Sequence, residues 1–141
     1  NVYGHDMGSE HVIPEFIKKI SKVNSKKVKL KINGTGREIR SFIHIDDFVN
    51  AFGLIFAKGK HMEIYNIGTQ NKIRMMNLAK LIGKNLNKKI LIQKNLQLNG
   101  GTNIRCPNIK KIKKLGFKEK VSLDKGLKRI IEEIKNSYAK N

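Results

Sequence analysis

The sequence has little cysteine, little proline and no tryptophan, and the first two shortages exclude particular classes of protein. Its single cysteine, Cys106, can form neither an internal disulfide nor a cysteine-rich zinc site. So few thiols are typical of a reducing compartment, and we expect a cytoplasmic protein. The two prolines, Pro14 and Pro107, lie far apart, and no proline- or serine-rich linker divides the 141 residues. The length and composition therefore predict one compact domain.

Long apolar runs are also missing. No stretch approaches the roughly 18 consecutive apolar residues that a membrane-spanning helix needs, so we expect no association with a membrane. The first six residues are polar and lack the basic and apolar regions of a signal peptide. They also lack an initiating methionine, and we expect the chain to be a piece of a longer protein.

Acidic residues are scarce, because 11 Asp and Glu stand against 30 Lys and Arg and give a formal net charge of +19. Such a charge attracts polyanions and raises the possibility of a basic nucleic-acid-binding module without enzymatic activity. However, 25 of the 30 basic residues are lysine, whereas base edges are often read by arginine. The lysines are also spread from Lys18 to Lys140. We therefore interpret them as a solvated surface, expect no specific nucleic-acid partner, and keep the nucleic-acid module as the alternative.

Hydrophobic periodicity predicts short strands that alternate with helices. In order, the patterns predict a helix over 14–23, a strand over 28–32, a strand over 39–45, a helix over 48–56, a brief strand over 64–68, a helix over 78–86, a strand over 90–92, a short helix over 109–115 and a last helix from 123. Asp46 and Asp47 are interpreted as helix caps, and His44 as a packed histidine. The alternation indicates the α/β or α+β class.

Five segments resemble, in the expected order, motifs of the extended short-chain dehydrogenase/reductases, the family of sugar-nucleotide epimerases and 4,6-dehydratases. They cover nearly the whole chain. The segments are Asn1-Val2-Tyr3-Gly4, Val12 to Ile17, Gly34 to Asp47 with its Arg-x-Phe stretch, Tyr65-Asn66-Ile67-Gly68, and Arg105 followed by Leu115-Gly116-Phe117.

This resemblance implies an α/β fold in which residues 1–141 form the sugar-nucleotide substrate-binding C-terminal portion, with the last elements of a Rossmann-type domain. The family's glycine-rich dinucleotide turn and Tyr-x-x-x-Lys pair lie upstream of Asn-Val-Tyr-Gly, so the N-terminal NAD-binding domain is expected to be absent from this chain. The full-length protein is then an NAD-dependent epimerase or dehydratase and a homodimer. A non-catalytic relative that senses nucleotides is a third possibility.

The resemblance also assigns substrate contacts. Arg40 and Arg105 match the family's diphosphate-binding arginines, and arginine suits that role because its planar, always-charged group binds phosphate oxygens bidentately. Asn1 matches the substrate-contacting asparagine. His11 and Val12 match nucleobase contacts, and Asn33 stands where an aromatic ring often stacks on the base. The competing interpretation of the arginines is a pair of surface ion pairs.

We expect no catalytic residue and no metal site in this chain. Tyr3, Tyr65 and Tyr138 have no lysine four positions on, so none reproduces the Tyr-x-x-x-Lys pair. The Gly34-Thr35-Gly36 turn lacks the third glycine of a dinucleotide fingerprint. Cys106 is interpreted as a buried small hydrophobe. The chain alone is therefore expected to be inactive.

Overall fold

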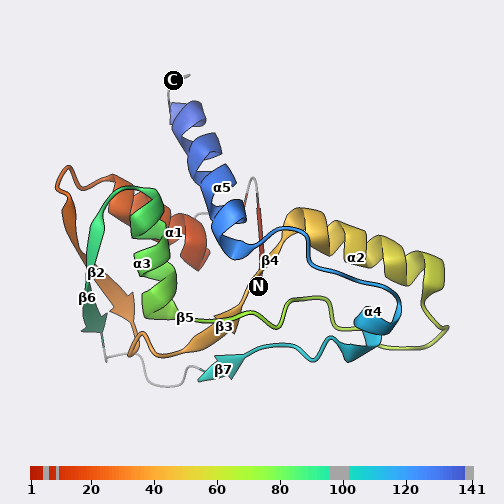
Figure 1. The fold of residues 1–141 in the computed structure, drawn as a ribbon. Helices are drawn as coiled ribbons and strands as arrows, with labels where there is room; N and C mark the ends of the chain where they lie inside the picture. The colour runs from red at the N-terminus through yellow and green to blue at the C-terminus, as the bar shows by residue number, and fades with distance from the viewer. Residues whose placement is uncertain (5–6, 9, 96–101, 139–141) are drawn as a thin grey trace.

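The structure, a computed structural model, describes residues 1–4, 7–8, 10–95 and 102–138, and it confirms the α/β class. Strands and helices alternate along the chain (Figure 1). In chain order they are β1 (Val2–Tyr3), α1 (Val12–Ser21), β2 (Lys27–Asn33), β3 (Ile39–Ser41), β4 (Ile43–His44), α2 (Ile45–Lys58), β5 (Lys72–Arg74), α3 (Met75–Asn85), β6 (Lys89–Asn95), β7 (Ile104–Arg105), α4 (Lys110–Lys114) and α5 (Leu123–Tyr138).

The described strands form three small sheets. β2 pairs in parallel with β6, and β1 pairs in parallel with β4. In the third sheet β3 is central, antiparallel to β5 and parallel to β7. The period-2 pattern predicted for 28–32 is confirmed, because Val28, Leu30 and Ile32 are buried while the residues between them are exposed.

The larger hydrophobic cluster packs α1, α3 and α5 around the β2–β6 sheet, on one side of the molecule in Figure 1. Its fully buried side chains include Ile13, Ile20, Leu78, Ile82 and Leu127. Helical spacing of apolar residues predicted the inner faces of these helices, since positions three and four apart share one face.

A smaller cluster lies between α2 and α4, on the opposite side in Figure 1. It contains Ile43, Ala51, Ile109, Ile112 and Phe117. Only one face of α2 enters this cluster. The two clusters adjoin in the sequence at β4, since Phe42 belongs to the larger cluster and Ile43 to the smaller.

One strand prediction was wrong, and other strands were missed or divided. Residues 64–68 form no strand, because no described strand pairs with them and Ile64 is exposed. β5 was missed, since Lys72-Ile73-Arg74 is short and largely polar and is a strand only through its pairing with β3. The predicted strand over 39–45 is divided at Phe42 into β3 and β4, which belong to different sheets.

The interpretation of Asp46 and Asp47 as helix caps was also wrong. The cap of α2 is the buried His44, whose Nδ1 accepts a hydrogen bond from the backbone N–H of Asp46 at 3.2 Å. The carboxylate of Asp47 is buried and accepts from the backbone N–H groups of Lys120 and Val121, at 2.9–3.2 Å. Asp47 therefore connects α2 to the segment that leads into α5.

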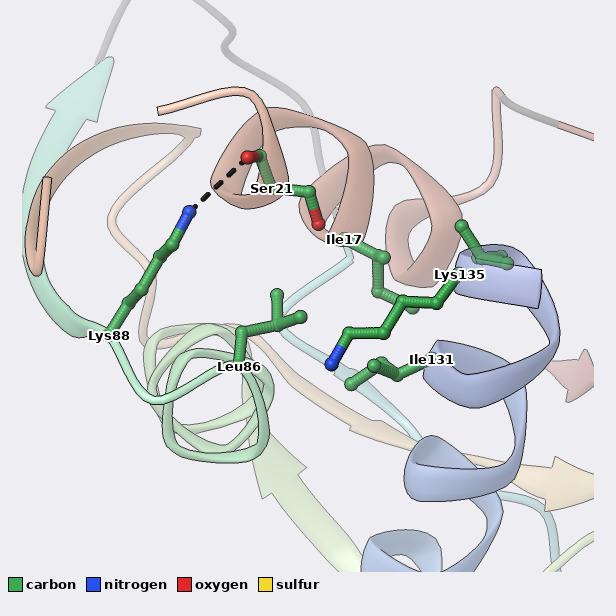
Figure 2. Close-up of a pocket in the computed structure, with 7 residues that line it drawn as sticks. Ile17, Ser21, Leu86, Lys88, Ile131 and Lys135 are labelled. Carbon is green, nitrogen blue, oxygen red and sulfur yellow. Dashed lines mark hydrogen bonds between the residues drawn. The ribbon is translucent and has the colours of Figure 1, made fainter. Parts of the chain in front are cut away.

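The end of α1 is held by a lysine from the turn after α3 (Figure 2). The Nζ of Lys88 donates hydrogen bonds to the carbonyl oxygens of Ile20, Ser21 and Val23, at 2.8, 3.2 and 2.5 Å. The last carbonyls of a helix have no partner within the helix, and a cation there also interacts favourably with the helix dipole. Lys88 thus supplies a C-cap over a long distance in sequence.

We expect Lys88→Met to lower the free energy of unfolding by about 1–2 kcal/mol, because the carbonyls lose a charged donor while the aliphatic stem is kept. Urea unfolding measures the change. Lys89→Met is the matched control, since Lys89 is exposed and stands opposite Lys27 on β2, so its loss should be neutral or slightly stabilising. Equal losses in both variants would contradict the capping role.

Candidate functional site

Arg40 and Arg105 lie directly opposite each other, because β3 and β7 pair in parallel with Arg40 in register with Arg105. Paired residues of neighbouring strands project on the same face of a sheet, and the strands are about 4.8 Å apart. Burial, and then the charge of Arg105, lower the pKa of Arg40, while the nearby Glu38 opposes this shift. The two arginines thus form a concentrated positive charge on one face of this sheet.

Neither arginine forms an ion pair within 4.0 Å with a carboxylate among the described residues, although the charge of Glu38 acts on Arg40 from further away. The ion pairs found there join other groups, such as Arg129 with Asp46 and Lys128 with Asp124. Arg40 donates from Nη1 to the carbonyl oxygen of Ile39 at 2.8 Å, which orients the guanidinium without cancelling its charge. Like charges directly opposite each other destabilise a sheet, so this pair is costly unless an anion offsets it.

Asn1 lies beside this pair. Its side-chain Nδ2 donates to the carbonyl oxygen of Ser41 at 2.9 Å, and its own carbonyl oxygen accepts from the backbone N–H of Ile43 at 3.0 Å. Both contacts hold β1 against the β3–β4 bend. Asn1 and Arg105 line one cavity of about 510 Å³. The other residues lining this cavity are Ser41, Ile43, Ile67, Gly68, Ile104, Cys106 and Pro107.

Arg40 is not among the residues that line this cavity, and neither are the other three predicted contacts. His11 is exposed at the N-cap of α1, and Val12 begins that helix, half-buried against the larger cluster. Asn33 ends β2, where its side-chain oxygen accepts from Asn95 Nδ2 at 3.4 Å. Their assignment to the nucleobase stays a prediction.

Sequence reasoning missed part of the cavity wall. Ser41 follows Arg40 on the same strand, and Gly68 packs so closely on Pro107 that an added Cβ would lie 2.5 Å from its ring. Cys106, interpreted as a buried hydrophobe, is half-buried and lines the cavity, with Sγ 3.7 Å from the carbonyl oxygen of Thr69. The sequence could have pointed to these residues only through their neighbours. Ser41 follows Arg40, Cys106 follows Arg105, and Gly68 ends the Tyr-Asn-Ile-Gly motif.

The glycine turn at 34–36 does not fit a dinucleotide phosphate. Gly34 and Gly36 have positive φ angles of 85° and 74°, but the turn leads into strand β3 and not into a helix. The position that a phosphate would take in this turn is already occupied by the carboxylate of Glu38. Its Oε1 accepts hydrogen bonds from the backbone N–H and the hydroxyl of Thr35, both at 2.8 Å. This turn therefore offers no cradle for NAD.

The carboxylate of Glu38 also makes the stability of the fold depend on pH. Burial raises the pKa of Glu38, but hydrogen bonds from Thr35 and neighbouring backbone groups outweigh burial and hold it below its ordinary value. Because the folded-state pKa is lowered, the stabilisation is present above the unfolded-state pKa of about 4.3 and is lost as the pH falls through the folded-state pKa.

We therefore expect Glu38→Gln to cost about 1 kcal/mol of unfolding free energy at pH 7, a value reduced for solvent exposure, and less at pH 3. Urea unfolding at the two pH values measures the difference. A cost that is equal at pH 3 and pH 7 would contradict the role of the ionised carboxylate.

Tyr3 is packed as a structural residue. Its ring is buried, meets His44 edge-on with ring centres 5.3 Å apart, and presses against Gly126, where a Cβ would lie 2.3 Å from its hydroxyl. Burial, followed by the charges of Glu119 and Asp47, raises the pKa of Tyr3.

In the described part of the chain, no group of three or more His, Cys, Asp or Glu side chains is placed to hold a metal ion. No described helix is long and apolar enough to cross a membrane.

Comparison with known proteins matches both the sequence and the fold. Residues 1–68 match the model of the NAD dependent epimerase/dehydratase family. The dTDP-D-glucose 4,6-dehydratase of Bos taurus is 34% identical over 145 residues, which cover 98% of this chain and 40% of the relative. The chain therefore spans less than half the length of that curated relative.

Solved structures share the fold over nearly the whole chain. The UDP-glucose 4-epimerase of Thermotoga maritima, solved with UDP-glucose, is 27% identical with a TM-score of 0.83, over 98% of this chain and 44% of that one. The dTDP-glucose 4,6-dehydratase of Bacillus anthracis, solved with NAD, has a TM-score of 0.83 at 24% identity, over 99% of this chain and 43% of that one, and supports the fold alone.

Proposed function

We propose that this chain, which belongs to the NAD dependent epimerase/dehydratase family, is the substrate-binding part of an enzyme that acts on a nucleoside-diphosphate sugar. The observation that carries the proposal is the pair Arg40 and Arg105, which lie in register on β3 and β7 without a carboxylate partner among the described residues. The named relatives act on dTDP-D-glucose and UDP-glucose.

The chemistry of a diphosphate fits this pair. Two adjacent phosphates present several anionic oxygens, and two guanidinium groups on neighbouring strands can each bind them bidentately. Desolvation of Arg40 strengthens its interaction with an anion, since charges attract more strongly in a less polar environment. Asn1, at the wall of the adjacent cavity, could donate to a sugar hydroxyl by exchanging its bond to Ser41.

We also propose that NAD is bound mainly by a part of the enzyme outside this chain. NAD would accept a hydride from a sugar carbon and return it, while the residues of this chain hold the diphosphate and orient the sugar. The isolated chain is accordingly proposed to be inactive. A homodimeric full-length enzyme and a cytoplasmic location remain proposals on the same basis.

Calorimetric titration of the chain with UDP, dTDP, GDP and UMP tests the proposal. A clamp for two phosphates predicts that at least one nucleoside diphosphate binds more tightly than UMP. Single-stranded DNA provides the competing measurement. Binding of DNA that weakens steeply with salt, together with no response to any nucleoside diphosphate, would favour the basic nucleic-acid module instead.

A further inference from the structure

One face of the β2–β6 sheet carries a group of lysines. The side chains of β2 alternate, so its apolar residues point into the larger cluster while Lys27, Lys29 and Lys31 are exposed on the opposite face. Lys89 of β6 is in register with Lys27 and is exposed on the same face. Lysines that are spread along the sequence are thus gathered by the fold on one surface.

The rest of this face has no negative charge. The register places eight residues on it, which we call the lysine face: Lys27, Lys29, Lys31, Asn33, Lys89, Leu91, Gln93 and Asn95. None of the four lysines forms an ion pair among the described residues. Like charges directly opposite each other destabilise a sheet, so the pair Lys27 and Lys89 costs stability unless an anion offsets it.

The lysine face lies on the outside of the molecule. In Figure 1 the β2–β6 sheet forms one edge of the fold, and α1 and α3 lie on its inner side. Parallel sheets usually have both faces covered, whereas this one leaves a face open to solvent. Each of its strands has seven residues, so the face extends for about 20 Å. A surface of this length suits an extended polyanion.

The composition of the lysine face favours a nucleic acid over a protein or a membrane as the partner. Protein–protein interfaces are depleted in lysine and enriched in aromatic residues, which this face lacks. Protein–nucleic-acid interfaces are instead polar and strongly positive. Surfaces that lie on a membrane also need apolar anchors, and the one apolar residue among the eight is Leu91, which is 41% exposed.

The spacing of the lysines fits single-stranded nucleic acid. Alternate residues of a β-strand are about 6.7 Å apart, which is of the order of the separation between neighbouring phosphates in an extended single-stranded chain. Lysine binds phosphate as a point charge, and the side-chain amides of the face can donate to phosphate or sugar oxygens. No aromatic ring on this face offers a platform for stacked bases. The contacts are therefore with the backbone and do not depend on base sequence.

We propose that the lysine face is a further binding site of this protein, which holds single-stranded nucleic acid through its phosphates without reading the bases. Binding of this kind needs no specific nucleic-acid partner. Arg40 and Arg105 belong to a different sheet, so the proposed diphosphate site and the lysine face are separate. Either proposal can fail while the other stands.

Fluorescence anisotropy with a short labelled oligothymidylate tests the proposal. Replacing Lys27, Lys29 and Lys31 together with glutamine is expected to raise the Kd at least about tenfold in about 0.1 M salt. The slope of log Kd against log salt should become shallower by about 2, since each phosphate contact of a single-stranded chain contributes about 0.7. Arginine at the same three positions should preserve binding, because it keeps the charge.

The matched control replaces three exposed lysines on three different helices, Lys18, Lys58 and Lys125, with glutamine. It removes the same charge from the protein, and the Kd should rise less than about threefold. If the two triple variants weaken binding equally, the lysines act only as a solvated surface and the proposal is wrong. It is also wrong if the unaltered chain does not bind the oligonucleotide in about 0.05 M salt.

Polyglutamate and phosphatidylserine vesicles test the identity of the partner. Weaker binding of both than of the oligonucleotide supports the proposal. If either binds more tightly and loses its binding through the same triple substitution, the face takes an acidic protein segment or a membrane, and the proposal is overturned.

Circular dichroism checks the fold of each variant. Should the triple glutamine variant on β2 not fold, Lys29→Gln decides the matter, because Lys29 is the central lysine of that strand. Its salt slope should be shallower by about 0.7, and an unchanged slope would contradict the site.

Discussion

Replacing Asp47 with alanine is expected to lower the free energy of unfolding by about 3 kcal/mol, which corresponds to a fall of about 10 °C in the thermal midpoint. The carboxylate is 1% exposed and accepts hydrogen bonds from the backbone N–H groups of Lys120 and Val121. Its removal leaves these donors without a partner in a partly buried position. Breaking a buried polar contact from one side costs more than the contact itself contributes.

Asp46→Ala is the matched control, because it removes the same group from the neighbouring position. The Asp46 side chain is 60% exposed and pairs with the partly exposed Arg129 at 3.2 Å, so its loss should cost less than about 1 kcal/mol. Asp47→Asn should lie between the two, since it keeps an acceptor oxygen but loses the charge. If Asp46→Ala and Asp47→Ala destabilise the fold equally, both aspartates act only through the start of α2.

Arg40→Ala and Arg105→Ala are each expected to weaken binding of a nucleoside diphosphate by about 1.5–3 kcal/mol, or about 10- to 150-fold in Kd. Arginine to lysine at either position should restore part of the loss, because lysine keeps the charge but cannot bind two oxygens in one plane. Calorimetric titration of each variant with the best-binding nucleoside diphosphate measures the effect.

Arg74→Ala is the control for these substitutions. Arg74 is opposite Ile39 in the same sheet, and neighbouring residues of a strand alternate between faces, so Arg74 lies on the face away from Arg40. Its removal should leave affinity unchanged. A structural role for the paired arginines predicts lower stability in both alanine variants, whereas relief of their mutual repulsion predicts equal or slightly higher stability. Unchanged affinity in both variants would refute the diphosphate site.

The features that the sequence predicted correctly are those set by local pattern. The alternation of Val28, Leu30 and Ile32 predicted β2, and Ser122 before Leu123 marked the start of α5, where the Ser122 hydroxyl accepts from the N–H of Lys125 at 3.4 Å. Asn108 likewise accepts from the N–H of Lys110 beside α4.

The features that could not be predicted depend on contacts between distant residues. β5 and β7 are strands only because β3 lies beside them, and their two or three residues carry no periodicity of their own. The role of Asp47 could not be predicted, since a helix start offers an equally good local explanation for an aspartate. The family motifs pointed to Arg40 and Arg105 separately, but nothing in their spacing indicated that they lie in register.

The pairing of β3 with β7 has a consequence for the order in which the protein becomes able to bind. Arg40 and Arg105 are brought together by a contact that closes a loop of 65 residues, and long-range closures of this kind form slowly in folding. During synthesis from the N-terminus, a nascent chain that has passed β3, α2 and α3 still holds only Arg40, one half of the proposed diphosphate site. Under the proposed function, a diphosphate ligand therefore cannot guide the early collapse of the chain, and its capture reports that the polypeptide has folded as far as β7, about three quarters of its length.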